Sequence, residues 1–306
     1  MSKKKPFKRK YKFLIVTLFC VIAGYIYMVV TWTPVDSESK KASEAIIRQE
    51  AARQLTTDPN NSIDPNTLTD EDFAKIAEIN IYQKELTDIK LLEKFTNLQS
   101  LDVYEIRFPE KEIPSWMKIL AKLGVFDLSR RFSIDLSPLE NLTNLQDLNL
   151  GGSQISNIKP LKELKNLQRL TLSRTNVIDI KPLANLTNLQ SLKLTSTQVS
   201  DVKPLVNLIN LLSLKLGGSK AADIKPLANL TNLELLNLSD TQVSDIKSLA
   251  NLKKLIFLYL NDTQVSDISV LANLKNLQNL DLSDTQVSDE QIEDLQKALP
   301  NLEIIK

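Results

Sequence analysis

The C-terminal three quarters of the chain repeats one pattern of leucines. A leucine is followed by leucines three and five positions later, and successive copies begin 22 residues apart. The second half of this L-x-x-L-x-L motif alternates apolar and polar residues, which predicts a short β-strand with one buried face. The copies with all three leucines begin at Leu145, Leu167, Leu189, Leu211, Leu233, Leu255 and Leu277.

Degenerate copies extend the pattern in both directions. They place apolar residues at Ile76/Ile79/Ile81, Leu98/Leu101/Val103 and Leu123/Phe126/Leu128, with a last partial copy at Leu302/Ile305. The steps from 98 to 123 and from 277 to 302 are each 25 residues, so each is expected to hold a three-residue insertion. Residues 76–306 are therefore expected to form one repeat domain of about 11 units.

The rest of each unit predicts how the chain returns to the next strand. In the unit beginning at Leu189, Thr-Gln-Val-Ser-Asp turns the chain and Pro204 starts a short 3₁₀ return segment. One unit buries too little surface to fold alone, so the units must stack between capped ends. One hydroxyl residue per turn is expected to satisfy backbone groups of neighbouring turns. These residues are Ser153, Thr175, Thr197, Ser219, Thr241, Thr263 and Thr285.

The repeat resembles that of the leucine-rich repeat family, specifically the 22-residue bacterial type found in internalins. The resemblance covers about residues 70–306 and rests on L-x-x-L-x-L-x-x-T-x-(V/I)-x-D-I-x-P-L-x-N, for example from Leu189 to Asn207. It implies an α/β fold: a curved solenoid with a parallel sheet on its concave face, short 3₁₀ or irregular convex segments, and a role in protein recognition. The chain differs in having Thr where many members have Asn. It also has no LPxTG wall-sorting signal, so the wall attachment of internalins is not expected.

An apolar run of 18 residues without a charge lies at residues 13–30. A helix of this length spans about 27 Å, close to the hydrocarbon thickness of a bilayer. Tyr11 and Trp32 flank it where interfacial aromatics are favoured. The run predicts a transmembrane signal-anchor helix; a cleaved signal peptide and a buried soluble helix are the alternatives.

Basic residues precede this run and no acidic residue accompanies them. They are Lys3, Lys4, Lys5, Lys8, Arg9, Lys10 and Lys12. The positive-inside rule therefore predicts a cytoplasmic tail at residues 1–12 and a periplasmic or extracellular repeat domain. The membrane contact is expected through residues 13–30 alone, in a single pass.

Helical caps are expected at both ends of the array, after a linker at residues 31–42. Residues 43–75 have helical spacing and predict an N-terminal cap. Residues 288–306 predict a C-terminal cap, which begins with a Ser288–Gln291 capping box and closes the array.

The formal charge of +1 is the sum of two unlike regions. Residues 1–33 carry +7, and the remaining residues carry 31 basic against 37 acidic side chains, a net charge of −6. Basic and acidic residues are mixed beyond residue 33, so nucleic acid is not an expected partner.

The composition also excludes several kinds of chemistry. There is no histidine, one cysteine (Cys20) and only six glycines, which excludes His-based catalysis, His-based metal sites and intramolecular disulfides. An enzyme and a bound cofactor are therefore not expected. An exported array without disulfides is more typical of bacteria than of animals.

A partner-binding surface is expected on the outward positions of the strands. The residues singled out are Tyr82, Tyr104, Arg169, Arg174, Lys193, Lys215, Phe257 and Tyr259. Exposed aromatic residues beside segregated charges are typical of interface centres. The alternative is that they are only solvated positions of a repetitive surface.

Three weaker signals have structural alternatives. The insertion between Val103 and Leu123 is either a bulky local core or a partner-binding knob. The N-x-(S/T) triplets at Asn141, Asn185 and Asn229 follow from the repeat itself and are weak evidence of glycosylation. One aspartate per turn could suggest calcium, but turn capping is the better interpretation, and no metal site is expected. These aspartates are Asp201, Asp223, Asp245, Asp267 and Asp289.

Together these features predict a membrane-anchored, extracytoplasmic protein that binds a protein or cell-surface ligand through its repeats. The alternative is a structural, envelope-organising repeat protein without a specific ligand.

Overall fold

The computed structural model describes residues 37–56, 63–82, 86, 88–105 and 133–306. All of these residues belong to one unit, Ser37–Lys306. The expected tail at 1–12 and membrane helix at 13–30 lie outside the described residues. Within the described ranges, no helix combines the length and the apolar character needed to cross a bilayer.

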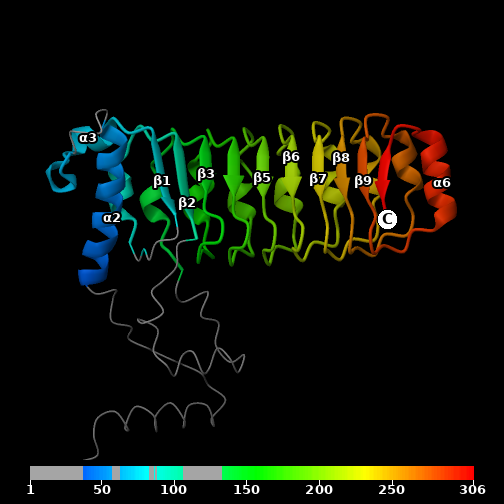
Figure 1. Cartoon of the computed structure of the whole chain (residues 1–306), viewed down its shortest axis with the longest axis horizontal. Helices are drawn as coiled ribbons and strands as arrows, with labels where there is room; N and C mark the ends of the chain where they lie inside the picture. Colours follow the sequence, from blue (N-terminus) through cyan, green and yellow to red (C-terminus); the bar gives the residue numbers. More distant parts are fainter. Residues whose placement is uncertain (1–36, 57–62, 83–85, 87, 106–132) are drawn as a thin grey trace, which may run out of the picture. The chain divides into compact units, whose positions relative to one another are not determined.

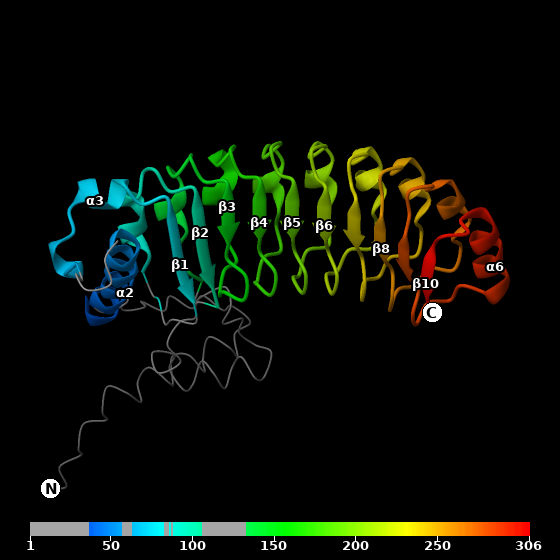
Figure 2. The ribbon, with the colours of Figure 1, turned by 45° about the horizontal axis from the view of Figure 1, so that its top comes forward.

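The repeats form one sheet of ten parallel strands in chain order, each paired with the strand before it. Figure 2 shows the row of strands running from α2 to α6. This confirms the predicted solenoid with a parallel sheet. The strands are β1 (Glu78–Tyr82), β2 (Ser100–Tyr104), β3 (Asp147–Asn149), β4 (Arg169–Thr171), β5 (Ser191–Lys193), β6 (Ser213–Lys215), β7 (Leu235–Asn237), β8 (Phe257–Tyr259), β9 (Asn279–Asp281) and β10 (Glu303–Ile305).

Short 3₁₀ segments return the chain behind the sheet, as the Lys-Pro-Leu pattern predicts (Figure 1). Proline occupies the first turn of many of them, where its missing N–H costs no hydrogen bond. They are η2 (Lys90–Lys94), η4 (Ser137–Leu139), η5 (Lys159–Glu163), η6 (Lys181–Leu183), η7 (Lys203–Leu205), η8 (Lys225–Asn229), η9 (Lys247–Asn251) and η10 (Ser269–Asn273), whereas η1 (Pro65–Thr67) belongs to the N-terminal cap.

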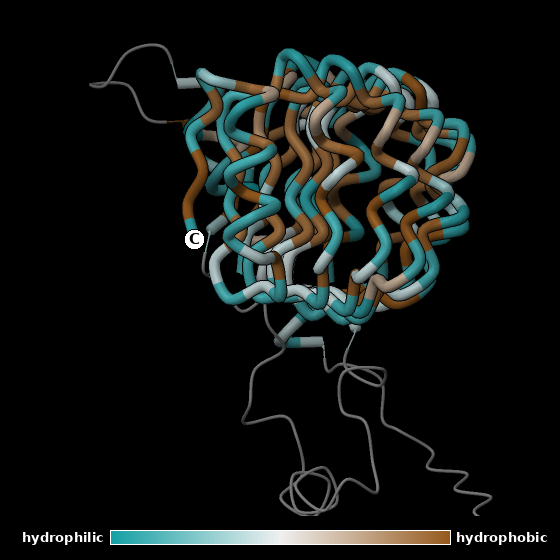
Figure 3. The backbone as a smooth tube through the Cα atoms, turned by 90° about the vertical axis from the view of Figure 1, so that its right-hand side faces the viewer, coloured by the Kyte–Doolittle hydropathy of each residue, from teal (hydrophilic) through white to brown (hydrophobic). Residues whose placement is uncertain are grey.

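The hydrophobic core runs along the whole array as one continuous cluster. In the unit of β5, Leu192, Leu194, Val199 and Leu205 are fully buried, and the other units repeat this arrangement. Viewed along the array, the apolar stretches of successive turns stack on one another (Figure 3). Each turn therefore buries its leucines only because a neighbouring turn covers them.

The hydroxyl residues act differently from the sequence prediction. The Thr197 hydroxyl donates to the carbonyl of Leu194 at 2.7 Å, so it closes its own turn and does not bridge to a neighbouring one. Ser153 is an exception, because its hydroxyl donates to Val103 in the preceding turn. The same bond within one turn occurs at Thr175, Thr241, Thr263 and Thr285.

Asparagine side chains bridge the turns instead. The Asn188 amide donates to the carbonyl of Lys165, 23 residues earlier, at 2.9 Å. This bond recurs in other units because an asparagine precedes most of the strands at the same position, with Lys254 in its place before β8. Its other donors are Asn166, Asn210, Asn232 and Asn276.

β2 and β3 are direct neighbours in the sheet, although the sequence predicts a copy between them. Ser100 of β2 pairs with Asp147 of β3, and the Gln146 N–H donates to the Gln99 carbonyl at 2.8 Å. The copy expected at Leu123/Phe126/Leu128 lies outside the described residues.

The last copy is shifted by one residue from the prediction. Ile304, not Ile305, is level with the buried Leu280, and Ile305 is 58% exposed. A one-residue shift reverses the faces of a strand. In the approach to this strand the Gln296 amide donates to the carbonyls of Leu299, Pro300 and Leu302.

The N-terminal cap begins earlier than expected. Helix α2 (Ser37–Leu55) starts within the expected linker, and its Ile47 and Ala51 are fully buried against the first turn. Helix α3 (Asp70–Ala74) has a complete capping box between Thr69 and Asp72. These contacts cover the open end of the leucine core.

The C-terminal cap is helix α6 (Asp289–Ala298). The Ser288 hydroxyl accepts from the Gln291 N–H at 3.3 Å, as predicted. The Gln291 side chain does not complete the expected box, because its oxygen accepts from the Ile268 N–H of the preceding turn at 3.2 Å. The cap is thereby fastened to the array.

Removing part of the N-terminal cap should destabilise the array. We expect Ile47→Ala to lower the free energy of unfolding by about 2–5 kcal/mol, because it leaves a cavity at a fully buried site. The matched control is Ile178→Ala, at a side chain that is 45% exposed, with an expected change within about 0.5 kcal/mol. Urea unfolding followed by circular dichroism measures both. Equal losses would contradict the capping role of α2.

The capping box should make the stability of the fold depend on pH in the acid range. The Thr69 backbone N–H, the Lys75 ammonium and the Thr69 hydroxyl lower the pKa of Asp72 from 3.8 to about 2. A lowered folded-state pKa stabilises the fold above about pH 4 and loses that effect as the pH falls toward 2. Asp72→Asn should therefore lower Tm at pH 7, and the difference from the native chain should shrink between about pH 4 and 2.

Thermal unfolding across this pH range tests the prediction, with Glu71→Gln in the same turn as the control. A Tm difference for Asp72→Asn that stays constant down to pH 2 would contradict it.

Candidate partner-binding face

The strands present two rows of outward side chains, which we call the strand face. In each three-residue strand the middle residue is buried and the first and third point outward. The parallel register aligns these positions across the sheet. The first row is Glu78, Ser100, Asp147, Arg169, Ser191, Ser213, Leu235, Phe257, Asn279 and Glu303. The second row is Asn80, Asp102, Asn149, Thr171, Lys193, Lys215, Asn237, Tyr259, Asp281 and Ile305.

The N-terminal part of the strand face carries two tyrosines, as predicted. Tyr82 and Tyr104 are neighbours in the β1–β2 register. The Tyr82 hydroxyl donates to Asp102 at 3.2 Å. Partial burial of the phenol, followed by the negative charge of Asp102, raises the pKa of Tyr82, so it stays a neutral hydrogen-bond donor at neutral pH.

The middle of the strand face carries the predicted cations in two different states. Arg169 is already paired with Asp147 on the neighbouring strand. Lys193 and Lys215 lie side by side in register, and neither takes part in an ion pair with another described residue. Two adjacent like charges cost stability in the free protein. An acidic partner would relieve this repulsion.

Arg174 is not part of the strand face, contrary to the prediction. It lies in the turn after β4 with φ of 57°, and its N–H donates to the carbonyl of Thr195 at 2.8 Å. The alternation of a strand ends before this position, because the turn requires a left-handed backbone here. The equivalent positions with positive φ are Glu105, Gly152, Ser196, Gly218, Asp240, Asp262 and Asp284.

The C-terminal part of the strand face is aromatic and apolar. Phe257 and Tyr259 both point outward from β8 and are half-buried. Leu235 is the register neighbour of Phe257, and Asn237 and Asp281 flank Tyr259. The two predicted aromatic residues therefore lie on one strand, beside an outward leucine that the sequence analysis did not single out.

A second group of exposed apolar residues was missed. Val206, Ile209 and Leu212 are 36%, 52% and 39% exposed and recur every three residues ahead of β6. The carbonyl of Leu212 accepts from the N–H of Leu235 at 3.0 Å, so this row continues onto the strand face. We call Val206, Ile209, Leu212, Leu235 and Phe257 the apolar patch.

The repeat itself contains the signal for this patch. The unit before has Ala184, Thr187 and Gln190 at the positions of Val206, Ile209 and Leu212, and the unit after has Ala228, Thr231 and Glu234. In this one unit, three residues are more apolar than the equivalent residues of both neighbouring units. Packing does not require this, because the side chains are exposed.

The repeated aspartates cap turns, as predicted. The Asp201 carboxylate accepts from the Lys203 N–H at 3.0 Å, and Asp223, Asp245 and Asp267 make the same bond. Hydrogen bonds from Ser269 lower the pKa of Asp267. Asp289 differs, because Lys306 pairs with it and lowers its pKa. Among the described residues, no three His, Cys, Asp or Glu side chains gather as metal ligands.

The comparisons with known proteins define the class. A family model described as leucine-rich repeats in two copies matches residues 165–207 and 231–273. No curated protein sequence matches significantly. Among solved structures, internalin C2 from Listeria monocytogenes is 30% identical with a TM-score of 0.65, over 79% of this chain and 94% of that one. The chain therefore belongs to the leucine-rich repeat family and is of the internalin type.

Two further structures agree. The internalin InlF from Listeria monocytogenes is 25% identical with a TM-score of 0.53, over 90% of this chain and 92% of that one. A leucine-rich-repeat protein from Leptospira interrogans is 27% identical with a TM-score of 0.61, over 78% of this chain and 62% of that one.

Proposed function

We propose that this protein is a membrane-anchored, extracytoplasmic binding protein that recognises a protein or cell-surface ligand through its strand face. The observation that carries the proposal is the contrast between the two sides of each strand. The buried positions are leucine in almost every unit, whereas the outward positions change from unit to unit. The proposal includes no catalytic role, no cofactor and no nucleic-acid partner.

The outward residues divide the strand face into three zones. Tyr82 and Tyr104 form the first, Lys193 and Lys215 the second, and Leu235, Phe257 and Tyr259 the third, which Leu212 adjoins. Interface centres favour aromatic and apolar anchors surrounded by polar groups. A partner with an apolar anchor for the third zone and acidic groups for the second would match this order.

The membrane anchor in the proposal is supported by the sequence. Residues 13–30 are apolar and long enough to span a bilayer, and seven basic residues precede them. The positive-inside rule favours a cytoplasmic N-terminus and a repeat domain on the other side.

Truncating the aromatic pair should remove binding without unfolding the array. We expect the double variant Phe257→Ala/Tyr259→Ala to weaken binding about 100-fold or more, because central aromatic anchors contribute about 2 kcal/mol or more each. The probe is the native cell-envelope protein captured by the full-length chain, identified by mass spectrometry and titrated in purified form.

The matched control is Ile178→Ala, which removes an exposed apolar side chain outside the strand face. Unchanged affinity of the double variant would refute the strand face as the binding surface. Failure to capture any saturable partner would favour the structural, envelope-organising alternative.

Removing the apolar run should release the protein from the membrane. We expect the full-length chain to remain in the membrane pellet after a carbonate wash, because an apolar helix of this length is not extracted by high pH. A deletion of residues 13–30 should move it to the supernatant. Protease added outside intact cells or spheroplasts should cut the repeat domain. Finding the full-length chain in the carbonate supernatant would contradict the anchor.

A further inference from the structure

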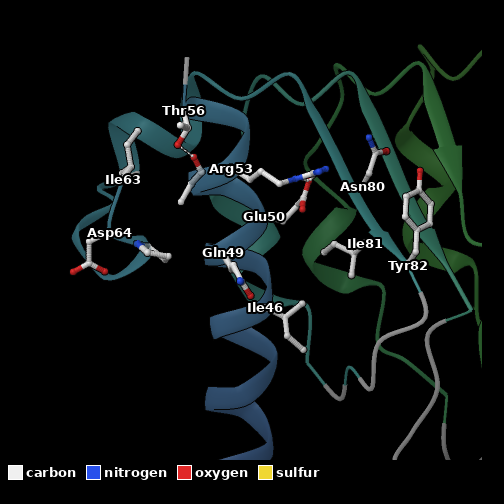
Figure 4. Close-up of a pocket in the computed structure, with 12 residues that line it drawn as sticks. Ile46, Gln49, Glu50, Arg53, Thr56, Ile63, Asp64, Asn80, Ile81 and Tyr82 are labelled. Atoms are coloured by element: carbon white, nitrogen blue, oxygen red, sulfur yellow. Dashed lines mark hydrogen bonds and ion pairs between the residues drawn. The ribbon is translucent and has the colours of Figure 1, made fainter. Parts of the chain in front are cut away.

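A cleft of about 840 Å³ lies between helix α2 and the first strand, β1. Its walls include Ile46, Gln49 and Arg53 of α2 and Asn80 and Tyr82 of β1 (Figure 4). This volume falls within the range of about 300–1,000 Å³ that is typical of ligand sites. The cleft is separate from the cationic and apolar zones of the strand face, which are several strands away.

One wall of the cleft is the open edge of the sheet. β1 is the terminal strand and pairs only with β2. The Ala77 carbonyl accepts from the N–H of Ser100 on β2 at 3.0 Å. Successive residues of a parallel strand direct their backbone groups to opposite sides, so those of Asn80 and Tyr82 face away from β2. No hydrogen bond within the described part of the chain joins these groups to α2.

Such an edge favours another extended backbone as its occupant. Unpaired N–H and C=O groups along a strand are satisfied best by an added strand with the same spacing. Helix α2 stands beside β1 and contacts it, so the space open to an occupant is the cleft itself, of about 840 Å³ (Figure 4). The edge of a second folded sheet would collide with the helix. The occupant is therefore a short extended peptide and not a second copy of this domain.

The side chains around the cleft define the character of that peptide. Ile46 and Ile63 offer apolar contacts. Glu50 and Arg53 neutralise each other at 2.9 Å, which leaves Asp64 in the lining without a basic partner among the described ion pairs.

Two residues that line the cleft are hydrogen-bonded to further carboxylates. The Asn80 amide donates to Glu78 at 2.8 Å, and the Tyr82 hydroxyl donates to Asp102. Glu78, Asp102 and Glu50 all act to raise the pKa of Tyr82, which is consistent with a negative local field. The surroundings therefore favour a positively charged ligand.

We propose that the cleft between α2 and β1 binds an extended peptide segment that adds a strand to β1 and alternates apolar with lysine or arginine residues. The cleft shares Tyr82 with the first zone of the strand face, but its test does not involve Lys193, Lys215, Phe257 or Tyr259, so its failure and the failure of the strand-face proposal are distinguishable.

The test uses three blocked heptapeptides with valine at alternate positions and lysine, serine or glutamate at the others. Binding to the full-length chain is measured by fluorescence anisotropy. We expect saturable binding of the lysine peptide, at least fivefold weaker binding of the serine peptide, and no measurable binding of the glutamate peptide.

Two N-methylated lysine peptides, modified on alternate residues, then test the backbone pairing. One should bind at least tenfold more weakly, and the other should bind within twofold of the parent.

A protein variant locates the site. Gln49 is exposed and lines the cleft, so Gln49→Trp should fill the space and weaken the lysine peptide at least tenfold. The matched control is Gln198→Trp, at an exposed turn far along the array, with binding unchanged. No saturable binding, equal effects of the two N-methylated peptides, or equal effects of the two tryptophan variants would overturn the proposal.

Discussion

The structure depends on one constraint: each turn can satisfy its backbone and bury its leucines only against another turn. The Gln190 N–H donates to the Gln168 carbonyl of the preceding turn at 2.8 Å, and Asn188 bridges the same two turns through Lys165. Because most turns repeat these bonds, the buried positions are mostly leucine and the asparagine recurs at the same place in most units. The ends of such a stack have no neighbour, so α2 and α6 cover them.

The same constraint leaves the outward positions free to vary. No stacking bond involves the side chains of Lys193, Lys215 or Tyr259, so their identity does not follow from the fold. In an isolated protein, two adjacent lysines without a counter-charge repel each other, and an apolar patch exposes apolar area to water. Both features lower the stability of the free protein. Their presence in an otherwise regular array is consistent with a surface that is completed by a partner.

The sequence predicted what periodicity controls, namely the strands, their parallel order, the 3₁₀ returns and the capping aspartates. It failed where local geometry overrides the period. The Thr197 hydroxyl bonds the Leu194 carbonyl of its own turn and not a group of a neighbouring turn. Arg174 was assigned to a strand that had already ended in a left-handed turn. The last strand pairs one residue out of the predicted register, with Ile304 level with Leu280. The sequence shows that Ile209 differs from the equivalent residues of neighbouring units. Only the structure shows that its side chain is exposed and is therefore not required for packing.

Photo-crosslinking in the native envelope tests the central claim most directly. Benzoylphenylalanine is introduced at Tyr259 on the strand face or at Lys225 at the start of η8, the 3₁₀ segment that returns the chain behind the sheet between β6 and β7. The account predicts one discrete adduct from position 259 and none from position 225. Adducts of equal yield from both positions, or an adduct from position 225 alone, would contradict it.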